Sequence, residues 1–89
     1  MLCIEFSQVA SKFLDKAEQN IAQRLMRTIE SLEAEPFPKG VTRVENQWFE
    51  KENVFRIRVG DYRILYSFNS EKKRVMIVNI DNRGRAYKN

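Results

Sequence analysis

The 89-residue sequence contains no histidine, one cysteine, three glycines and two prolines. With Cys3 as the lone thiol and no histidine, the usual zinc, haem and iron–sulfur ligand sets cannot be assembled, and neither can a histidine-based catalytic triad. A disulfide within the chain is excluded as well. We therefore predict that the protein uses no metal and no cofactor. Cys3 is expected to be a buried strand residue rather than a nucleophile, because no histidine is present to activate it.

Long apolar runs are also missing. Residues 1–5 lack the charged start and the long apolar run of a signal peptide. No later apolar stretch approaches the roughly 20 residues that a membrane span requires. These absences predict a cytoplasmic protein without membrane association. A chain of this length buries only about 60% of its unfolded surface, so we expect a single domain over residues 1–89, with a small core and any chemistry on its surface.

Charge is distributed unevenly along the chain. Residues 1–52 carry seven Lys and Arg against nine Asp and Glu, a net charge of −2. Residues 53–89 carry nine against three, a net charge of +6, and Arg outnumbers Lys six to three there. A region this basic is typical of a phosphate-binding surface, although a solvated charged face gives the same composition. The charge pattern alone leaves both interpretations open.

Two amphipathic helices are predicted in the N-terminal half, after a short strand at residues 2–6. The first is capped by Ser7, and its apolar residues recur at helical spacing: Val9, Ala10, Phe13, Leu14 and Ala17. The second begins near a capping box formed by Asn20 and Gln23, ends before Pro36, and has one apolar stripe: Ile21, Leu25, Ile29 and Leu32. Residues 41–52 are expected to form a loop with room for one short strand.

The most informative pattern is a β-hairpin at residues 54–68. Two alternating stretches flank Gly60-Asp61, and glycine at the first of two turn positions indicates a type II′ turn. A two-residue turn determines the register, which pairs Val59 with Tyr62, Arg58 with Arg63, Ile57 with Ile64, and Arg56 with Leu65. The apolar residues then face the helices: Phe55, Ile57, Val59, Tyr62, Ile64, Tyr66 and Phe68.

Arg56, Arg58 and Arg63 share the opposite face of this hairpin. Like charges that are directly opposite destabilise a strand pair by a few tenths to about 1 kcal/mol, so folding alone does not favour Arg58 across from Arg63. One interpretation is an anion held between the two guanidinium groups. The other is that the two side chains splay into water or pair with Asp61.

A final strand is predicted at residues 74–81. Met76, Val78 and Ile80 are expected to face the core, which places Asp81 and Arg83 on the arginine face. The fold class is then α+β with the order β-α-α-β-β-β. It has an antiparallel sheet with two N-terminal helices packed on one face and a basic, open opposite face.

Two sequence runs resemble a known family. FRIRVGDYRILY at residues 55–66 and IDNRGRAY at residues 80–87 resemble the RelE family of toxins in the RelE/ParE superfamily. The resemblance covers essentially the whole chain and implies a RelE-like, microbial-RNase-like fold and a toxin of a type II toxin–antitoxin system with a RelB-like antitoxin partner. The RelE branch cleaves mRNA in the ribosomal A site, which makes the ribosome and mRNA implied partners. The ParE branch, the alternative, inhibits DNA gyrase and is not an enzyme.

The resemblance also implies site residues. Four are implied as catalytic: Arg58, Arg63, Arg83 and Tyr87. Five more are implied as RNA-binding: Arg56, Arg85, Lys88, Lys72 and Lys73. Many relatives carry histidine where this chain has Asn82, so that side chain cannot carry a proton here. Trp48 and Phe49 are interpreted as core or antitoxin-contact residues.

RNA can be cut without a metal when its own 2′-hydroxyl attacks the adjacent phosphorus. Arginines can stabilise the extra charge of the phosphorane, and removing one such donor typically lowers the rate about 10²–10³-fold. Tyr87 can donate a proton to the leaving oxygen or stack on a base, and a plain C-terminal anchor is the alternative role. Because no side chain in the sequence ordinarily titrates near neutrality, we predict negligible activity on free RNA and a dependence on the ribosome.

Overall fold

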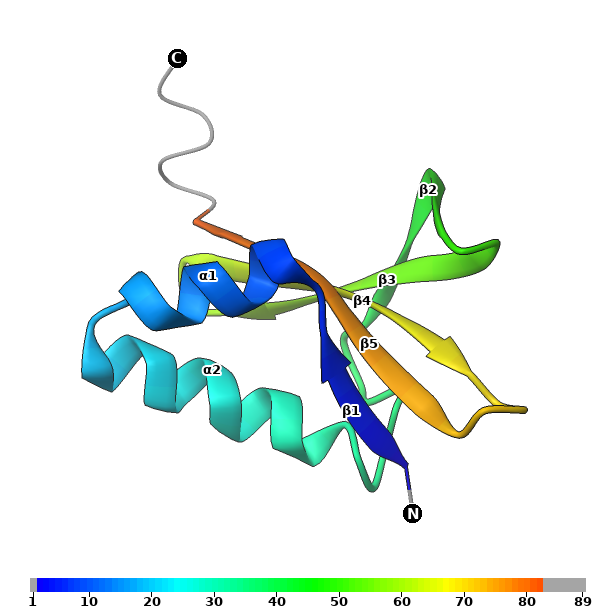
Figure 1. Ribbon diagram of the computed structural model, residues 1–89, viewed down its shortest axis with the longest axis horizontal. Coiled ribbons are helices and arrows are strands. Elements are labelled where there is room, and N and C mark those ends of the chain that lie inside the picture. The colour runs from blue at the N-terminus through cyan, green and yellow to red at the C-terminus, as the bar shows by residue number, and fades with distance from the viewer. Residues whose placement is uncertain (1, 83–89) are drawn as a thin grey trace.

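Residues 2–82 are described by the computed structural model of the chain, and they form a five-stranded sheet with two helices over one face (Figure 1). In chain order the elements are β1 (Cys3–Phe6), α1 (Gln8–Lys16), α2 (Gln19–Ser31), β2 (Thr42–Phe49), β3 (Glu52–Val59), β4 (Tyr62–Asn69) and β5 (Arg74–Asn82). The predicted α+β class and the position of both helices after the first strand are confirmed. No helix in this part of the chain is long and apolar enough to cross a membrane.

The sheet is mixed rather than antiparallel. Its strand order is β1-β5-β4-β3-β2, and β1 pairs in parallel with β5, whereas all other neighbours are antiparallel. The expectation of an antiparallel sheet was therefore wrong for β1, whose partner lies at the other end of the chain. Ile4 and Phe6 pack against the core, so the alternating Cys3 lies on the outer face of this edge strand. Cys3 is exposed, contrary to the expectation of a buried thiol.

β2 occupies most of residues 41–52, where the sequence predicted a loop with one possible short strand. It pairs with β3 through a two-residue turn at Glu50 and Lys51, whose φ angles of 49° and 69° are both positive, as in a type I′ turn. The register shifts between Val44 and Trp48, and Asn46 between them has a φ of 61°. This irregularity interrupts the strand alternation that would have revealed β2. Trp48 is 62% exposed and is therefore not a core residue.

The N-terminal cap of α1 agrees with the sequence prediction, whereas that of α2 does not. Ser7 caps α1 as predicted, accepting a hydrogen bond from the Ala10 amide at 3.1 Å, and its hydroxyl donates to the Val78 carbonyl at 2.7 Å. These two bonds tie the start of α1 to β5. α2 begins at Gln19 without a side-chain cap, so the predicted capping box was wrong: Asn20 already lies inside the helix.

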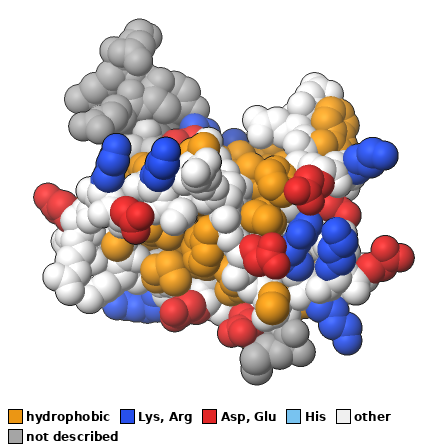
Figure 2. Space-filling model, viewed as in Figure 1, with side chains coloured by type: hydrophobic (Ala, Val, Ile, Leu, Met, Phe, Trp, Pro, Cys, Tyr) orange, Lys and Arg blue, Asp and Glu red, His pale blue; other side chains and the backbone are white. Residues whose placement is uncertain are grey.

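The core lies between the helices and the sheet. Its fully buried residues include three of the four predicted stripe positions of α2 together with side chains from α1, β4 and β5: Ala10, Leu25, Ile29, Leu32, Ile64, Tyr66, Val75, Ile77 and Ile80. From the helix side, apolar side chains show between these elements, and charges of both signs surround them (Figure 2).

The inward-facing residues of β5 differ from the prediction. Val75 and Ile77 belong to the core cluster, whereas Met76 is buried outside that cluster and Val78 is only partly buried; Ile80 faces the core as expected. The cause is a register shift between β4 and β5 next to Leu65 and Tyr66, which changes the alternation of β5 partway along the strand.

Candidate functional site

The β3–β4 hairpin places the predicted arginines as the turn chemistry indicated. Arg58 is directly opposite Arg63, and Arg56 is opposite Leu65. Gly60 opens the turn with a φ of 59°, and an added Cβ there would collide with the guanidinium group of Arg24 from α2. The positive φ favours glycine, whereas the end of the Arg24 side chain could move aside, so the turn that determines this register depends on Gly60 through its backbone angle.

Arg63 has an acidic partner on the next strand. Its Nε donates a 3.0 Å hydrogen bond to Oδ1 of Asp81, which is its Cα partner in the β4–β5 pairing. The two side chains are 18% and 35% exposed, respectively, so the ion pair is partly shielded from solvent. The sequence interpretation had considered Asp61 as a partner for the arginines. The structure assigns this role to Asp81 on the face where it was predicted to lie.

The site is therefore a row of charges across three neighbouring strands. Arg58 on β3, Arg63 on β4 and Asp81 on β5 stand side by side in register. Arg58 is exposed and Arg56 is half-buried, and neither takes part in an ion pair among residues 2–82. The row carries a net positive charge, and Asp81 offsets part of the repulsion between its two arginines.

A fourth arginine of this face serves the fold. Arg74, at the start of β5, is 13% exposed and contacts Glu5 of β1 at 3.6 Å and Glu50 of the β2–β3 turn at 3.2 Å. Asn69 of β4 also donates a 2.7 Å hydrogen bond to Glu52 of β3. These contacts join the strand ends at the far end of the sheet from Arg58 and Arg63.

The predicted RNA-binding lysines lie at that far end. Lys72 and Lys73 are exposed in the turn between β4 and β5, which the pair Asn69 and Arg74 closes. Asn69 lies six positions beyond Arg63 along β4, which corresponds to roughly 20 Å. The structure does not bring these lysines to the arginine row. The other predicted site residues lie outside the described part of the chain: Arg83, Arg85, Tyr87 and Lys88.

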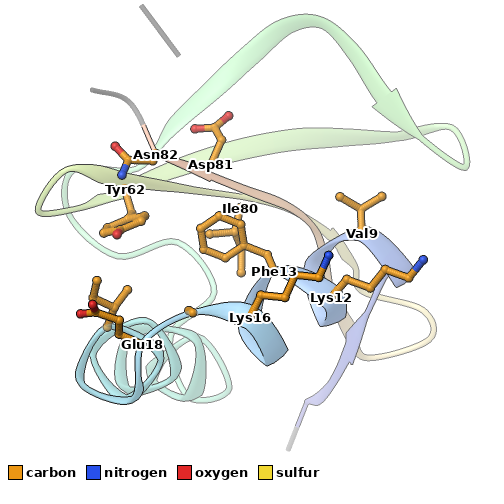
Figure 3. Close-up of a pocket in the computed structure, with 11 residues that line it drawn as sticks. Val9, Lys12, Phe13, Lys16, Glu18, Tyr62, Ile80, Asp81 and Asn82 are labelled. Atoms are coloured by element: carbon orange, nitrogen blue, oxygen red, sulfur yellow. The ribbon is translucent and has the colours of Figure 1, made fainter. Parts of the chain in front are cut away.

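A hollow of about 860 Å³ lies on the helix side at the same end of the sheet as the arginine row. Phe13 and Tyr62 meet edge to face in it with ring centroids 6.0 Å apart, and Lys12 and Lys16 of α1 form part of its wall. Figure 3 shows Tyr62 directed toward the helices, whereas the carboxylate of Asp81 is directed away from them. Asp81 also lines the hollow, so the hollow and the arginine row adjoin at this end of the sheet, with the hollow extending toward the helices.

The described residues also limit the chemistry available to the site. Among residues 2–82, no group of three or more acidic, histidine or cysteine side chains could hold a metal ion. The guanidinium groups of the row supply permanent positive charge and planar sets of hydrogen-bond donors, which suit phosphate oxygens.

Comparisons with known proteins identify the family and the fold of the chain. The sequence model of the ParE toxin of type II toxin–antitoxin systems, parDE, matches residues 4–87. A search of curated protein sequences found no significant match.

Among solved structures, the archaeal RelE–RelB complex from Pyrococcus horikoshii OT3 matches with 26% identity and a TM-score of 0.78, covering 94% of this chain and 97% of the other. The toxin–antitoxin complex RelBE2 from Mycobacterium tuberculosis has 25% identity and a TM-score of 0.74, with 92% and 98% covered. The intact E. coli RelBE complex shares the fold at 17% identity, with a TM-score of 0.71 and 92% and 96% covered. The chain thus belongs to the ParE toxin family of type II toxin–antitoxin systems, within the RelE/ParE superfamily, and has a RelE-like fold.

Proposed function

We propose that residues 1–89 form one toxin domain that acts as a ribosome-dependent endoribonuclease and cleaves mRNA in the A site without a metal. The observation that carries the proposal is Arg58 directly across from Arg63 on the face that the helices leave uncovered. The repulsion between two arginines that face each other does not stabilise the fold. A phosphate bound between the two guanidinium groups would turn this repulsion into attraction to a shared anion. Arg56, on the same face of β3, adds a third cation within two residues.

The proposed reaction is an in-line attack of the RNA's own 2′-hydroxyl on the adjacent phosphorus. The bond to the 5′-oxygen breaks, and the products are a 2′,3′-cyclic phosphate and a free 5′-hydroxyl. The phosphorane formed in between carries one more negative charge on its non-bridging oxygens than the diester. Arg58 and Arg63 would donate hydrogen bonds to these oxygens, and Arg56 would orient the strand.

Two protons must also move during this reaction. An arginine keeps its proton at pKa values above about 12, so Arg58 and Arg63 cannot act as the general base. We assign proton donation to the leaving 5′-oxygen to Tyr87, with Arg83 as a further phosphate contact. Removal of the 2′-hydroxyl proton is left to the ribosome or to water. This division explains why activity would require the ribosome, which aligns the strand for attack.

Partners and location follow from the same proposal. The matched solved structures from three organisms are complexes of RelE with RelB, which supports a RelB-like antitoxin for this toxin. The further partners would be the ribosome and mRNA in the cytoplasm. An antitoxin chain could lie along the hollow beside α1, whose apolar floor and lysine wall suit an acidic amphipathic segment.

One observation favours a second candidate function. The family model that matches residues 4–87 is that of ParE rather than RelE. ParE toxins inhibit DNA gyrase without catalysing a reaction. In that case the arginine row would contact a protein partner, and no RNA would be cut.

Primer extension on translated messages after induction separates the two functions. We expect cuts inside codons with the natural chain, and we expect Arg63→Ala to weaken them about 10²–10³-fold. The matched control is Arg43→Ala, which removes an exposed arginine from β2 on the helix side of the sheet and should leave the cuts in place. Intact messages together with double-strand DNA breaks would instead establish gyrase inhibition. Efficient cutting of naked RNA by the pure protein, in the presence of chelator, would overturn the ribosome dependence.

A further inference from the structure

We propose that Asp81 is a positioning residue that holds the guanidinium group of Arg63 in the orientation needed at the scissile phosphate. This inference rests on the proposed endoribonuclease function. Asp81 was not among the catalytic or RNA-binding residues predicted from the sequence. The observation behind it is the 3.0 Å contact from Arg63 Nε to Asp81 Oδ1 between residues that are partners across β4 and β5.

The atom that Asp81 contacts determines which edge of Arg63 faces the substrate. A guanidinium group has five N–H donors, one on Nε and four on the two Nη atoms. A carboxylate bound at Nε occupies the side edge of the planar group. The edge that carries both Nη atoms is then the one that can form paired hydrogen bonds with a phosphate.

The neighbours of Arg63 explain why it needs such an anchor. Arg58 stands directly opposite on β3, and its positive charge repels that of Arg63. Asp81 stands on the other side, on β5, and attracts it. Because Arg63 is only 18% exposed, solvent screens this attraction less than it would at an open surface. The ion pair therefore holds Arg63 within the row against the repulsion from Arg58.

This role predicts that the loss of Asp81 lowers the cleavage rate constant without weakening the binding of mRNA. Removing the Asp81 carboxylate makes the site more positive, so the affinity for ribosome-bound mRNA should stay the same or increase. The cleavage rate constant should fall, because a misplaced catalytic group costs up to about 100-fold. A residue that only tuned the charge of the site would not separate the two quantities in this way.

Single-turnover cleavage on programmed ribosomes measures both quantities. We expect Asp81→Ala to lower the rate constant about 10- to 100-fold without raising the half-saturating concentration. Asp81→Asn should recover most of the loss, since its amide oxygen accepts the same hydrogen bond. The matched control is Asp61→Ala, which removes an exposed carboxylate from the β3–β4 turn and should leave the rate unchanged.

The same variants in an Arg63→Ala background show whether Asp81 acts through Arg63. Positioning predicts that Asp81→Ala then causes no further loss. An equal loss in both backgrounds, or no loss in either, would overturn the assignment. Thermal unfolding of each variant identifies any that fail to fold, and Asp81→Asn, which keeps the shape of the side chain, provides the second test in that event.

A measurement without cleavage separates this proposal from the proposed function. In NMR spectra of the free toxin, the Nε–H resonance of Arg63 should be protected from exchange with water. Protection should be lost in Asp81→Ala and kept in Asp61→Ala, and inorganic phosphate should shift this resonance less in Asp81→Ala. An unprotected resonance in the natural chain would refute the positioning role even if mRNA is cut. Protection without any mRNA cleavage would refute the endoribonuclease function alone.

Discussion

The two faces of the sheet are built from the same strands, but different interactions explain which residues they carry. On the helix side of β4, Ile64 and Tyr66 are fully buried, and they pack with Leu25 of α2 in the core cluster. One residue away on β4, the uncovered face carries Arg63, which is opposite Arg58 on β3. Burial of apolar surface accounts for the residues of the first face. It does not account for two arginines in register.

This difference indicates where function lies on the uncovered face, since that face is not uniform. At one end, Arg74 contacts Glu5 and Glu50 and is nearly buried, so its charge is used within the fold. At the other end, Arg58 is exposed, and only its neighbour Arg63 has an acidic partner in Asp81. Among the arginines at the two ends, the one without an ion pair, Arg58, lies at the second end, and that end is the proposed phosphate site.

The largest effect on stability should come from the helix-covered face. Leu25 is fully buried, and Leu25→Ala removes its packing against the sheet, which should lower the free energy of unfolding by about 2–5 kcal/mol. Urea denaturation measures this change. The control Gln23→Ala, at an exposed position of the same helix, should change stability little. Equal stabilities of the two variants would show that α2 does not hold this face together.

Arg58→Ala should show the reverse pattern. We expect the cleavage rate on programmed ribosomes to fall about 10²–10³-fold, since one charge-stabilising donor is lost. The free energy of unfolding should stay the same or rise by a few tenths to about 1 kcal/mol, because the like-charge pair with Arg63 is removed. Arg43→Ala is the control for both measurements. A clear loss of stability in Arg58→Ala would mean that this arginine serves the fold, as Arg74 does.

The hairpin register was predictable because its cause is local. Gly60 at the first turn position determines the pairing of Arg58 with Arg63, and the apolar stripe of α2 identified Leu25 and Ile29 as core residues. The RelE-like fold was also predicted, from the arginine-rich hairpin motif and the C-terminal run.

Irregular strands and distant pairings were harder to predict from the sequence. β2 was predicted only as one possible short strand within a loop, because the irregularity at Asn46 breaks its alternation and its turn contains no glycine. The contact between Arg63 and Asp81 depends on the register between β4 and β5, which the loop between these strands does not reveal. Asp81 could be placed on the correct face from the sequence, but its partner could not be named.

Tyr66 carries a buried hydroxyl group on the helix-covered face, and its removal tests how much that group contributes to stability. This hydroxyl donates a 2.7 Å hydrogen bond to the Pro36 carbonyl, and burial raises the pKa of the phenol above its ordinary value of 10.0. Tyr66→Phe leaves that carbonyl without its partner and should lower stability by about 1–3 kcal/mol at neutral pH, as measured by urea denaturation.

The raised pKa also predicts a pH dependence. The unfolded chain loses the phenolic proton at about pH 10, whereas folded Tyr66 keeps it to higher pH. The stability that Tyr66 contributes is thus complete below pH 10 and declines above it by about 1.4 kcal/mol per pH unit, until the folded pKa is reached. Denaturation of the natural chain and of Tyr66→Phe across this range should show a gap that narrows as the pH rises. A constant gap would contradict the raised pKa.

The smallest effect is expected at the far end of the uncovered face. Lys72 lies in the β4–β5 turn, roughly 20 Å from the arginine row, so it can contact distant phosphates but not the reacting one. Lys72→Ala should leave the cleavage rate constant unchanged. It should weaken binding to programmed ribosomes a few-fold and reduce the slope of log affinity against log salt by about 1.

Lys39→Ala, which removes an exposed lysine from the loop after α2, is the control for this experiment and should change neither quantity. A fall in the rate constant of Lys72→Ala as large as that of Arg58→Ala would contradict this prediction. It would show that the reacting phosphate does not bind only at the end of the sheet where Arg58 and Arg63 meet. The functional surface would then have to extend along the whole uncovered face, including the end where Arg74 is bound by Glu5 and Glu50.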